Sequence, residues 1–425
     1  MLNIMVIGGG AREHALVWKL SQSSDVGEIY VTPGNAGTGL TANNLNIKSA
    51  EIELLAQAAQ ERRIDLTVVG PEATLAEGIV DLFQRYGLPI FGPTKEATKI
   101  ESSKVFAMEL MQRYGIPCAR SRSFSSFIEV KDYVRNQKPP IVVKADGLAA
   151  GKGSIIANST NEALAALSEI MEKRIFGKAG DQVLVEECLV GKEVSLLAFT
   201  DGRTVVPMVP ACDYKRVFDG DEGPNTGGMG SYSPPGFFDV EMINRVNDII
   251  LKPTVQAMAK EGKPYKGVLY VGIMLTEGGP KALEFNARFG DPETQAMLPL
   301  LKSDLVDIML AVIDERLDRI EIEWSDEACV GVVMASGGYP DSYKTGFPIE
   351  GLDKIDDDIL VFHAGTKVSD STICTDGGRV LTVAATGMDI AEARDRVYTN
   401  IPSINFEGCH YRNDIGAREV PHELL

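Results

Sequence analysis

The sequence lacks the features of membrane proteins and of secreted, disulfide-bonded proteins. No apolar run approaches the ~20 residues that cross a bilayer, and the N-terminus has neither a basic region nor a cleavage site. The six cysteines include no Cys-x-x-Cys pair, so neither a zinc site nor a disulfide framework is indicated. We therefore expect a cytoplasmic protein with reduced cysteines and no membrane partner.

Positive charge is also scarce. Lys and Arg number 42 against 60 Asp and Glu, which gives a formal net charge of −18 and disfavours nonspecific binding to nucleic acid or anionic membranes. We expect no nucleic-acid partner, and an anionic substrate must meet positive charge that is concentrated locally. The 425 residues, 44% of them hydrophobic, allow roughly two to four domains.

The first 100 residues alternate strands and helices. Strands are expected at 2–7, 28–31, 65–69 and 89–91. A helix-like run through Leu20 follows the first strand, and helices are expected at 51–62 and 76–86. This alternation predicts a parallel sheet that is covered on both faces and binds ligands at the carboxyl ends of its strands.

A glycine turn, Gly8-Gly9-Gly10, connects the first strand to the first helix, where free backbone N–H groups can bind an anion. Glu13 stands where the dinucleotide motif has its third glycine. The second strand also does not end in the acidic residue that would hold an NAD ribose. A dehydrogenase is therefore disfavoured, and a phosphate-bearing small molecule remains a candidate ligand.

A hairpin tip rich in glycine and lysine spans residues 144–154. The β-branched runs at 140–143 and 155–157 predict the strands that flank it. Glycines allow close approach of backbone N–H groups to a ligand, and the lysines add positive charge. A Walker A loop opens a helix instead, so we interpret the hairpin as a lid that closes on the phosphates of ATP. The candidate contacts are Lys144, Gly151, Lys152 and Gly153.

Lys104 lies in the first turn of an expected helix at 102–114, capped by Ser102 or Ser103. A cation in this position opposes the helix dipole, which an anionic ligand nearby would justify. Lys104 is therefore a candidate phosphate contact.

A strand at 182–185 ends in Glu186 and Glu187. Adjacent side chains on a strand point to opposite faces, so at most one of these carboxylates can point into a site. The backbone that follows could pair with an adenine edge. Glu193, one turn later, is suited to accept hydrogen bonds from ribose hydroxyls.

A polar, glycine-rich segment covers residues 211–230 and is expected to be a long loop. Asp213, Lys215 and Arg216 precede its glycines, and Asn225-Thr226 lies among them. Because loops of this length inside compact domains are usually functional or disordered, we favour a substrate-binding loop over a linker.

The strand at 283–288 carries an alternating polar pattern. Glu284, Asn286 and Arg288 are expected on one face, and the face toward the core takes Leu283, Phe285 and Ala287. A carboxylate and an amide oxygen on one face suit Mg²⁺ that is shared with phosphate oxygens. The alternative is a surface strand with fortuitous polarity.

Residues 324–326 mark a boundary. Beyond it, strands at 328–334, 360–363 and 380–385 and a helix at 390–398 predict a smaller α+β module. We expect His363 and His410 to be structural.

Taken together, the segments 8–15, 144–153 and 284–293 resemble the phosphoribosylamine–glycine ligase family of the ATP-grasp superfamily. The resemblance extends over essentially the whole chain and implies an α/β and α+β protein with the ATP-grasp fold. It implies a Rossmann-like parallel-sheet domain over 1–100, an ATP-grasp domain over 101–325 with a mobile ATP lid at about 120–190, and a C-terminal α+β domain over 326–425.

The resemblance also implies the reaction. ATP, glycine and 5-phosphoribosylamine would give ADP, phosphate and glycinamide ribonucleotide in purine biosynthesis, through a glycyl phosphate intermediate. It implies Mg²⁺ or Mn²⁺ as the metal and small molecules as the partners, and we expect a monomer.

Particular residues receive roles from this resemblance. ATP binding falls to Lys104, Lys144, Gly151, Lys152, Gly153, Ser154, Glu186, Glu187, Leu189 and Glu193. Substrate binding falls to Gly8, Gly9, Gly10, Asp213, Lys215, Asn225, Thr226 and Arg288. Lys144, Asp213 and Arg288 are the expected catalytic residues, and Glu284 and Asn286 the expected metal ligands.

Two departures from the family pattern stand out. Cys212 and Tyr214 occupy positions where the family more often has Gln and His, and residues 267–275 lack the acid that many ATP-grasp enzymes carry on this strand. The alternative function is another ATP-grasp ligase or a carboxylase of purine synthesis. The acid, amide and arginine face argues against a noncatalytic ATP sensor.

Overall fold

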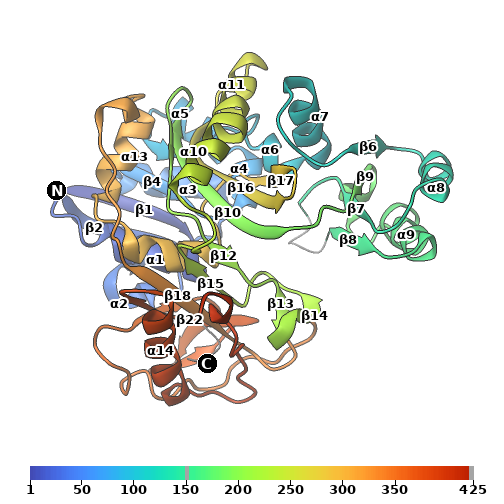
Figure 1. Ribbon diagram of the computed structural model, residues 1–425. Helices are drawn as coiled ribbons and strands as arrows, with labels where there is room; N and C mark the ends of the chain where they lie inside the picture. The colour runs from blue at the N-terminus through green and yellow to red at the C-terminus, as the bar shows by residue number, and fades with distance from the viewer. Residues whose placement is uncertain (149–152, 421–425) are drawn as a thin grey trace.

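The computed structural model describes residues 1–148 and 153–420. Figure 1 shows a main body from which one lobe projects at the right, with the C-terminal module below the body. No helix in these two ranges has both the length and the apolar character needed to cross a membrane.

The N-terminal sheet is parallel, as expected, with the strand order β3-β2-β1-β4-β5. Its strands are β1 (Leu2–Gly8), β2 (Val26–Pro33), β3 (Asn43–Asn44), β4 (Leu66–Val69) and β5 (Ile90–Phe91). The helices of this region are α1 (Ala11–Leu20), α2 (Thr38–Thr41), α3 (Ile52–Glu61), α4 (Glu72–Glu77) and α5 (Ile79–Arg85).

Both faces of this sheet are buried, which explains the continuous apolar character of β1. Ile4 and Val6 pack in one hydrophobic cluster with Leu16 of α1. Met5 and Ile7 point to the other face and belong to a separate cluster with residues of α3 and α5. The carboxyl end of β1 therefore delivers the glycine turn to a fixed place on the sheet edge.

The prediction of a single helix at 76–86 is wrong, because this segment belongs to two helices, α4 and α5. Gly78 has a φ of 94°, and its backbone N–H closes the end of α4 by donating to Leu75 O. A left-handed residue ends one helix, and α5 then begins at Ile79.

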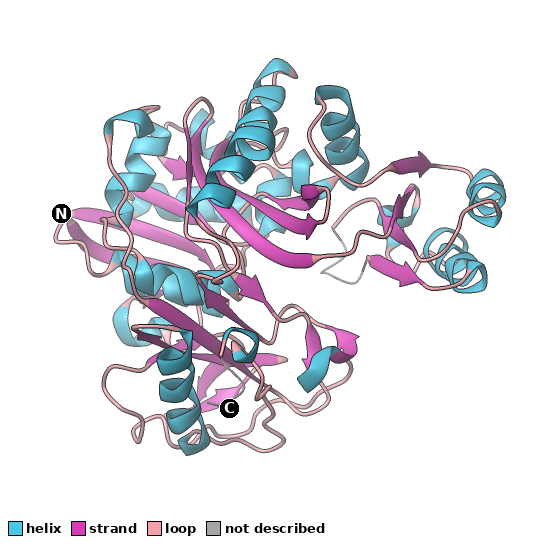
Figure 2. Cartoon of the chain, in the orientation of Figure 1, coloured by secondary structure: helices cyan, strands magenta, loops and turns pink. Residues whose placement is uncertain are grey.

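The projecting lobe contains residues from the segment at about 120–190 for which a lid is expected. Its four-stranded sheet has the order β6-β9-β7-β8 and is antiparallel throughout. The elements are β6 (Ser121–Phe124), α8 (Phe127–Arg135), β7 (Ile141–Ala145), β8 (Ser154–Ala157), α9 (Thr160–Leu167) and β9 (Val183–Glu187). Figure 2 shows its helices at the outer end and its strands facing the body. The lobe has its own core, which includes Val143 and Leu167, so it packs as a separate unit.

The central sheet has the order β11-β10-β16-β17. Its strands are β10 (Lys192–Asp201), β11 (Val205–Pro207), β16 (Lys266–Thr276) and β17 (Gly279–Asn286). The nearby helices are α6 (Lys99–Ser102), α7 (Lys104–Tyr114), α10 (Val240–Val246), α11 (Lys252–Lys260), α12 (Glu293–Met297) and α13 (Leu305–Ile313).

A β-bulge interrupts β17 at Leu283. Gly272 of β16 pairs with Glu284, and the next residue of β16 pairs with Ala282, so Leu283 has no partner in the ladder. Phe285 and Ala287 are buried, as expected, but Leu283 is only half-buried. The expectation that Leu283 faces the core with them is therefore wrong.

The third sheet has the order β12-β15-β18-β22-β19. Its strands are β12 (Cys212–Asp213), β15 (Gly230–Ser233), β18 (Ala328–Ala335), β19 (Leu360–His363) and β22 (Arg379–Gly387), and α14 (Ile390–Asn400) packs on it. The expected strands and helix of the C-terminal module are confirmed. β12 and β15 come from the middle of the chain, so this sheet joins two distant segments.

Residues 211–230 are not the expected long loop. Besides β12, they form an antiparallel hairpin of β13 (Arg216–Phe218) and β14 (Glu222–Asn225). A second hairpin, β20 (Thr366–Ser369) with β21 (Thr372–Thr375), lies in the C-terminal module. The β13–β14 strands are short and β14 is fully exposed, so their sequence has no burial pattern that would predict a strand.

Candidate functional site

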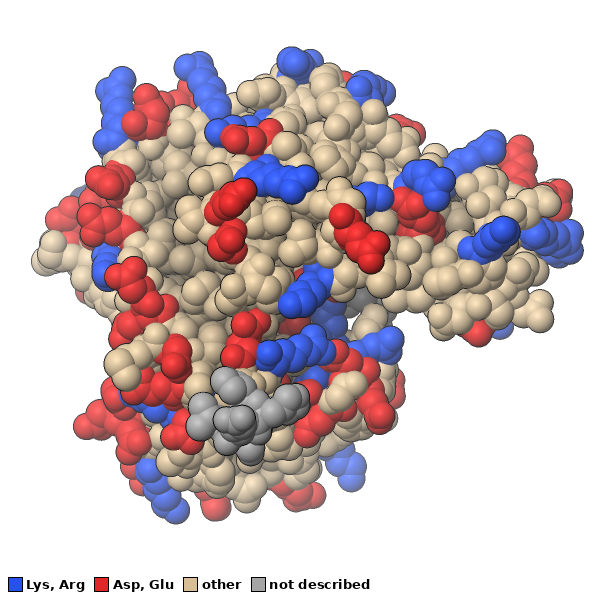
Figure 3. Space-filling model, in the orientation of Figure 1, with Lys and Arg blue, Asp and Glu red and all other residues tan. Residues whose placement is uncertain are grey.

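A cavity of about 830 Å³ lies where the lid lobe, the central sheet and the C-terminal module meet. Residues of β8, β10, β12 and β16 contribute to its lining. Among the residues predicted from the sequence, it is lined by Ser154, Glu193, Asp213, Lys215 and Asn225. Figure 3 shows basic side chains gathered in the hollow beside the lid lobe, although the chain as a whole is acidic.

Lys144 lies at the inner edge of the lid and is buried. Its ammonium contacts Glu186 Oε2 at 2.7 Å and donates to Leu283 O at 3.0 Å. The bulge at Leu283 makes this carbonyl available, because a residue outside the ladder does not use its backbone groups in strand pairing. Lys144 thus joins two lid strands to the central sheet.

Glu186 and Glu187 point to opposite faces, as the strand pattern predicts. Glu186 is 4% exposed, and burial raises its pKa, although Lys144 acts in the opposite direction. Glu187 accepts instead from Arg120 N and Nε and from Lys281 at the surface. Leu189 follows β9 without strand pairing and is half-buried.

Lys104 also points toward the lid. Ser103 caps α7 by accepting from Phe106 N at 3.1 Å, and Asp146 accepts from Val105 N at 3.1 Å. Lys104 Nζ donates to Gly147 O at 2.8 Å. Burial lowers the pKa of Lys104, and the strongest opposing influence is Glu284. The position of this lysine is therefore set by the start of the lid hairpin.

Glu284, Asn286 and Arg288 lie on the same side of β17 and just beyond it. Arg288 reaches back to Asn286 Oδ1 at 3.3 Å. Burial raises the pKa of Glu284, but Lys215, Lys144, Lys104 and Arg288 together hold it below the usual value. The predicted metal-ligand carboxylate therefore stays ionised in a cluster of cations.

Two carboxylates that hold Arg288 were missed in the sequence. Arg288 forms ion pairs with Glu72 at the start of α4 and with Glu101 of α6, both at 3.3 Å. The second oxygen of Glu101 accepts from Ala287 N at 2.7 Å. Glu72 follows the strand expected at 65–69, and the sequence analysis expected ligands at the carboxyl ends of such strands. No comparable signal marked Glu101.

Asp213, at the end of β12, and Lys215, in the segment that follows, both line the cavity. Burial raises the pKa of Asp213 to about 7, with Lys215 opposing and Glu293 reinforcing the change. Burial alone would lower the pKa of Lys215, but Asp213 and Glu193 raise it. Lys215 Nζ contacts Glu193 directly, so the ribose-binding and substrate-binding candidates meet at one ion pair.

Asn225 and Thr226 lie at the base of the β13–β14 hairpin. Thr226 donates to Lys215 O through both its N–H, at 2.7 Å, and its hydroxyl, at 2.9 Å. The exposed side chain of Asn225 lines the cavity. Thr226 therefore fixes the backbone of Lys215, and Asn225 is the more accessible of the two.

The glycine turn is closed by Glu13. Gly10 N donates to Glu13 Oε2 at 2.7 Å, and Arg12 pairs with the other oxygen. A Cβ at Gly8 would lie 2.5 Å from the Glu13 side chain. The acid that replaces the third glycine of a dinucleotide motif therefore fills the space under the turn. Gly9 completes the turn, with its carbonyl accepting from Asn35 Nδ2 at 3.0 Å.

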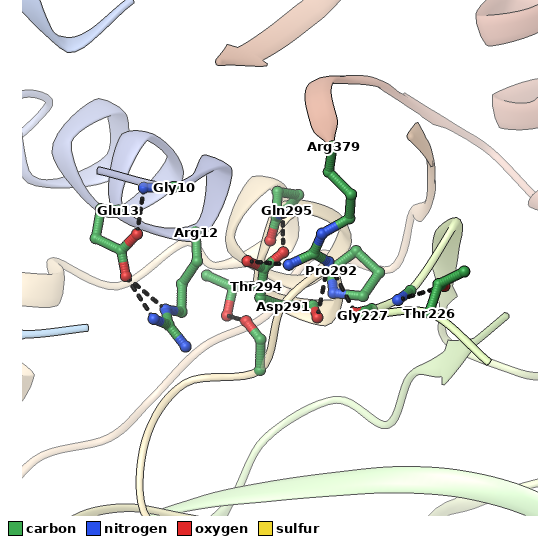
Figure 4. Close-up of polar contacts among 12 residues, drawn as sticks. Gly10, Arg12, Glu13, Thr226, Gly227, Asp291, Pro292, Thr294, Gln295 and Arg379 are labelled. Carbon is green, nitrogen blue, oxygen red and sulfur yellow. Dashed lines mark hydrogen bonds and ion pairs between the residues drawn. The ribbon is translucent and has the colours of Figure 1, made fainter. Parts of the chain in front are cut away.

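Arg379 of β22 connects the C-terminal module to Asp291 and Gly227, and the sequence analysis did not identify it. Its guanidinium donates to Asp291 Oδ2 at 2.9 Å and to Gly227 O at 2.8 Å. Figure 4 shows Arg379 reaching toward Asp291 and the segment at Thr226, with Gly10 and Glu13 in the same view. These elements lie far apart in the sequence, which gives no local signal for their meeting.

The remaining lid predictions divide into two groups. Gly153 O accepts from Ala145 N at 2.9 Å, and Ser154 pairs with Lys144 across the β7–β8 ladder. Gly151 and Lys152 lie outside the described residues.

We expect Glu186→Gln to lower the free energy of unfolding by about 3–5 kcal/mol, because it leaves the buried Lys144 ammonium without its carboxylate. The matched control is Glu187→Gln, at the next position on the same strand, which should cost about 1 kcal/mol or less because its side chain is partly exposed. Urea denaturation of both variants gives the comparison. Equal losses would contradict a special role for the buried pair.

Comparisons with known proteins cover the whole chain. Models of the phosphoribosylglycinamide synthetase family match in succession: the N domain over residues 2–101, the ATP-grasp (A) domain over 102–294 and the C domain over 329–418. A phosphoribosylamine–glycine ligase of Caldanaerobacter subterraneus is 51% identical, over 98% of this chain and 100% of its own. That of Halalkalibacterium halodurans is 49% identical, over 100% and 99%.

Solved structures agree. The phosphoribosylamine–glycine ligase of Thermotoga maritima is similar with a TM-score of 0.86 and 34% identity, over 97% of this chain and 100% of that one. A biotin carboxylase of Campylobacter jejuni has a TM-score of 0.75 at 12% identity, over 98% and 94%, which is a likeness of fold alone. The ATP-grasp prediction is therefore confirmed, and the chain belongs to the phosphoribosylglycinamide synthetase family of ATP-dependent ligases.

Proposed function

We propose that this chain joins glycine to 5-phosphoribosylamine at the expense of ATP, giving glycinamide ribonucleotide, ADP and phosphate in purine biosynthesis. The observation that carries the proposal is the environment of Glu284. The pKa of this one carboxylate is lowered by four cations that the sequence analysis had singled out: Lys104, Lys144, Lys215 and Arg288. Such a cluster can hold the phosphates of ATP on one side and anionic substrates on the other.

The proposed reaction has two steps. A carboxylate oxygen of glycine attacks the γ-phosphorus, the bond from phosphorus to the β,γ-bridging oxygen breaks, and ADP leaves. The amine nitrogen of phosphoribosylamine then attacks the carbonyl carbon of glycyl phosphate, phosphate leaves, and the nitrogen loses a proton. No protein nucleophile is needed, so catalysis consists of positioning and charge neutralisation.

Lys144, Lys104 and Arg288 supply the positive charge in this scheme. In the described structure Lys144 and Lys104 are held by groups of the lid itself, Glu186 and Gly147 O. ATP phosphates would compete for both ammonium groups, which couples nucleotide binding to the position of the lid. Lid closure then excludes water and protects the acyl phosphate from hydrolysis.

Mg²⁺ or Mn²⁺ is the proposed metal, and the donor set fits it. Glu284 and Asn286 offer a carboxylate and an amide oxygen on one side of β17. No cluster of three or more His, Cys, Asp and Glu suited to a metal occurs among residues 1–148 and 153–420. Two protein oxygens are enough for a hard cation that keeps waters and phosphate oxygens as its other ligands. When bound, the ion would neutralise charge on the phosphates of ATP.

We assign the second substrate to the face that Asp213, Lys215, Asn225 and the glycine turn provide. Lys215 offers a cation toward the phosphate or ribose, and Asp213, once ionised, attracts the amine. Arg288 is assigned to the glycine carboxylate. The domain boundaries expected at 100/101 and 325/326, a monomeric state and a cytoplasmic location belong to this proposal as well.

ADP release tests the reaction. With purified protein, Mg²⁺ and ATP, we expect release only when glycine and freshly prepared phosphoribosylamine are both present. Release with neither substrate, or with a different acid or amine, would overturn the assignment of the substrates and leave the ATP-grasp fold in place.

Glu284→Ala tests the metal assignment. We expect ADP release with both substrates to fall about 100-fold or more, because the variant removes the carboxylate that faces the cation cluster. Glu277→Ala is the control, since Glu277 is exposed in the turn between β16 and β17. Near-normal turnover by Glu284→Ala would remove Glu284 from the site.

Asp213 predicts a pH dependence. Because its pKa is raised to about 7, the side chain is protonated below that pH and becomes an anion above it. We expect kcat/KM for phosphoribosylamine to rise through pH 7, and Asp213→Asn to lose this inflection. The amine of the substrate titrates equally in both proteins, so the difference between the two profiles isolates Asp213. Identical profiles would contradict its role.

A further inference from the structure

The β13–β14 hairpin, which carries part of the proposed substrate site, is held by residues 412–419 of the C-terminal module. The central contact is Arg412, whose side chain has no exposed surface. Its Nη1 donates to Arg216 O at 2.9 Å and to Asp221 Oδ1 at 3.0 Å. Its Nε and Nη2 donate to the two oxygens of Asp414 at 2.7 and 2.6 Å.

The same guanidinium stacks on Tyr214. Arg412 lies 4.6 Å from the ring centroid of Tyr214, and Arg418 lies 5.2 Å from it. The hydroxyl of Tyr214 accepts from Gly416 N at 3.1 Å. Tyr214 is 3% exposed, so this ring is anchored in residues 412–419, whereas its neighbours Asp213 and Lys215 interact with the charged residues of the cavity.

Further contacts extend this attachment along the hairpin. Asn413 donates to Asp219 through its backbone N–H at 2.8 Å, and Gly220 N donates to Asp414 Oδ2 at 2.9 Å. Residues 412–419 therefore hold both the tip of the hairpin and its first strand, β13. With its base fixed by the bonds from Thr226 to Lys215 O, the hairpin has little freedom to shift.

From these contacts we infer that Arg412, acting through Tyr214 and the β13–β14 hairpin, is a positioning residue for the phosphoribosylamine site. Arg412 is not among the residues that line the cavity. It acts by fixing Arg216 O and the Tyr214 ring, and these fix Asp213, Lys215 and Asn225, their neighbours in the chain or in the hairpin ladder. The inference rests on the proposed function, because that proposal assigns the hairpin to phosphoribosylamine.

The chemistry of arginine suits this role. A planar guanidinium offers five N–H donors in a fixed fork and can stack on an aromatic ring at the same time, whereas a lysine ammonium is a point charge on a flexible stem. Lysine at 412 would keep the charge but could not serve Asp414, Asp221, Arg216 O and the Tyr214 ring together.

Steady-state kinetics of Arg412→Lys and Arg412→Met provide the test. We expect Arg412→Lys to raise KM for phosphoribosylamine about tenfold and Arg412→Met to raise it further, with KM for ATP and glycine changed by no more than about twofold. A variant that was merely less stable would not raise KM for phosphoribosylamine while leaving KM for ATP and glycine nearly unchanged. An unchanged KM for phosphoribosylamine in a folded variant, or an equal rise in all three constants, would overturn the inference.

Arg396→Lys is the control. Arg396 donates to Thr386 O at 2.5 Å and pairs with Asp358, so these side-chain contacts stay within the C-terminal module and do not reach residues 412–419. We expect its KM for phosphoribosylamine to stay at the wild-type value. If both Arg412 variants fail to fold, Asp414→Asn weakens the same network from the C-terminal side and should raise the same KM in the same direction; no rise would overturn the inference.

Wild-type kinetics separate this inference from the function on which it rests. If the wild-type protein does not use phosphoribosylamine, the proposed function fails. If the wild type uses it normally and the Arg412 variants do so with the same KM, the proposed function stands and the positioning role fails.

Discussion

The site depends on concentrating positive charge within an acidic chain. A net charge of −18 repels anionic substrates at long range, so the protein must collect its cations where they are needed. It does so around Glu284, and each cation has an acceptor of its own: Glu186 for Lys144, Gly147 O for Lys104, Glu193 for Lys215, and Glu72 and Glu101 for Arg288. These acceptors keep the cations in place, because bringing like charges together unpaired costs free energy.

Much of this arrangement was readable from the sequence. The parallel N-terminal sheet, the lid hairpin and the divergent directions of Glu186 and Glu187 follow from local periodicity and turn chemistry, which act over a few residues. The polar face of Glu284, Asn286 and Arg288 follows from strand alternation in the same way. The absence of the third glycine was visible in the sequence, but the structure was needed to show that Glu13 fills the space beneath the turn.

Contacts between distant segments were not readable. Arg379 reaches Asp291 across 88 positions, and Arg288 reaches Glu72 across 216, and no local pattern signals such meetings. The direction of the Leu283 side chain was predicted wrongly because a bulge adds one residue and breaks the strand alternation. The β13–β14 hairpin was not predicted because Val217 is its one fully buried strand residue, which gives no alternating pattern, and the rest of the hairpin is held by hydrogen bonds and by Arg412.

The composition of the third sheet has a consequence for synthesis of the chain. β12 and β15 leave the ribosome long before β18, which lies between β15 and β22 in the finished sheet. Until β18 arrives, one edge of β15 lacks its partner and is open to pairing with other chains. The N-terminal sheet and the lid contain all their strands by residue 187 and can fold first, whereas the β13–β14 hairpin acquires its support only when residues 412–419 emerge. A nascent or truncated chain can therefore contain the lid and its lysines while the hairpin still lacks the segment that holds it.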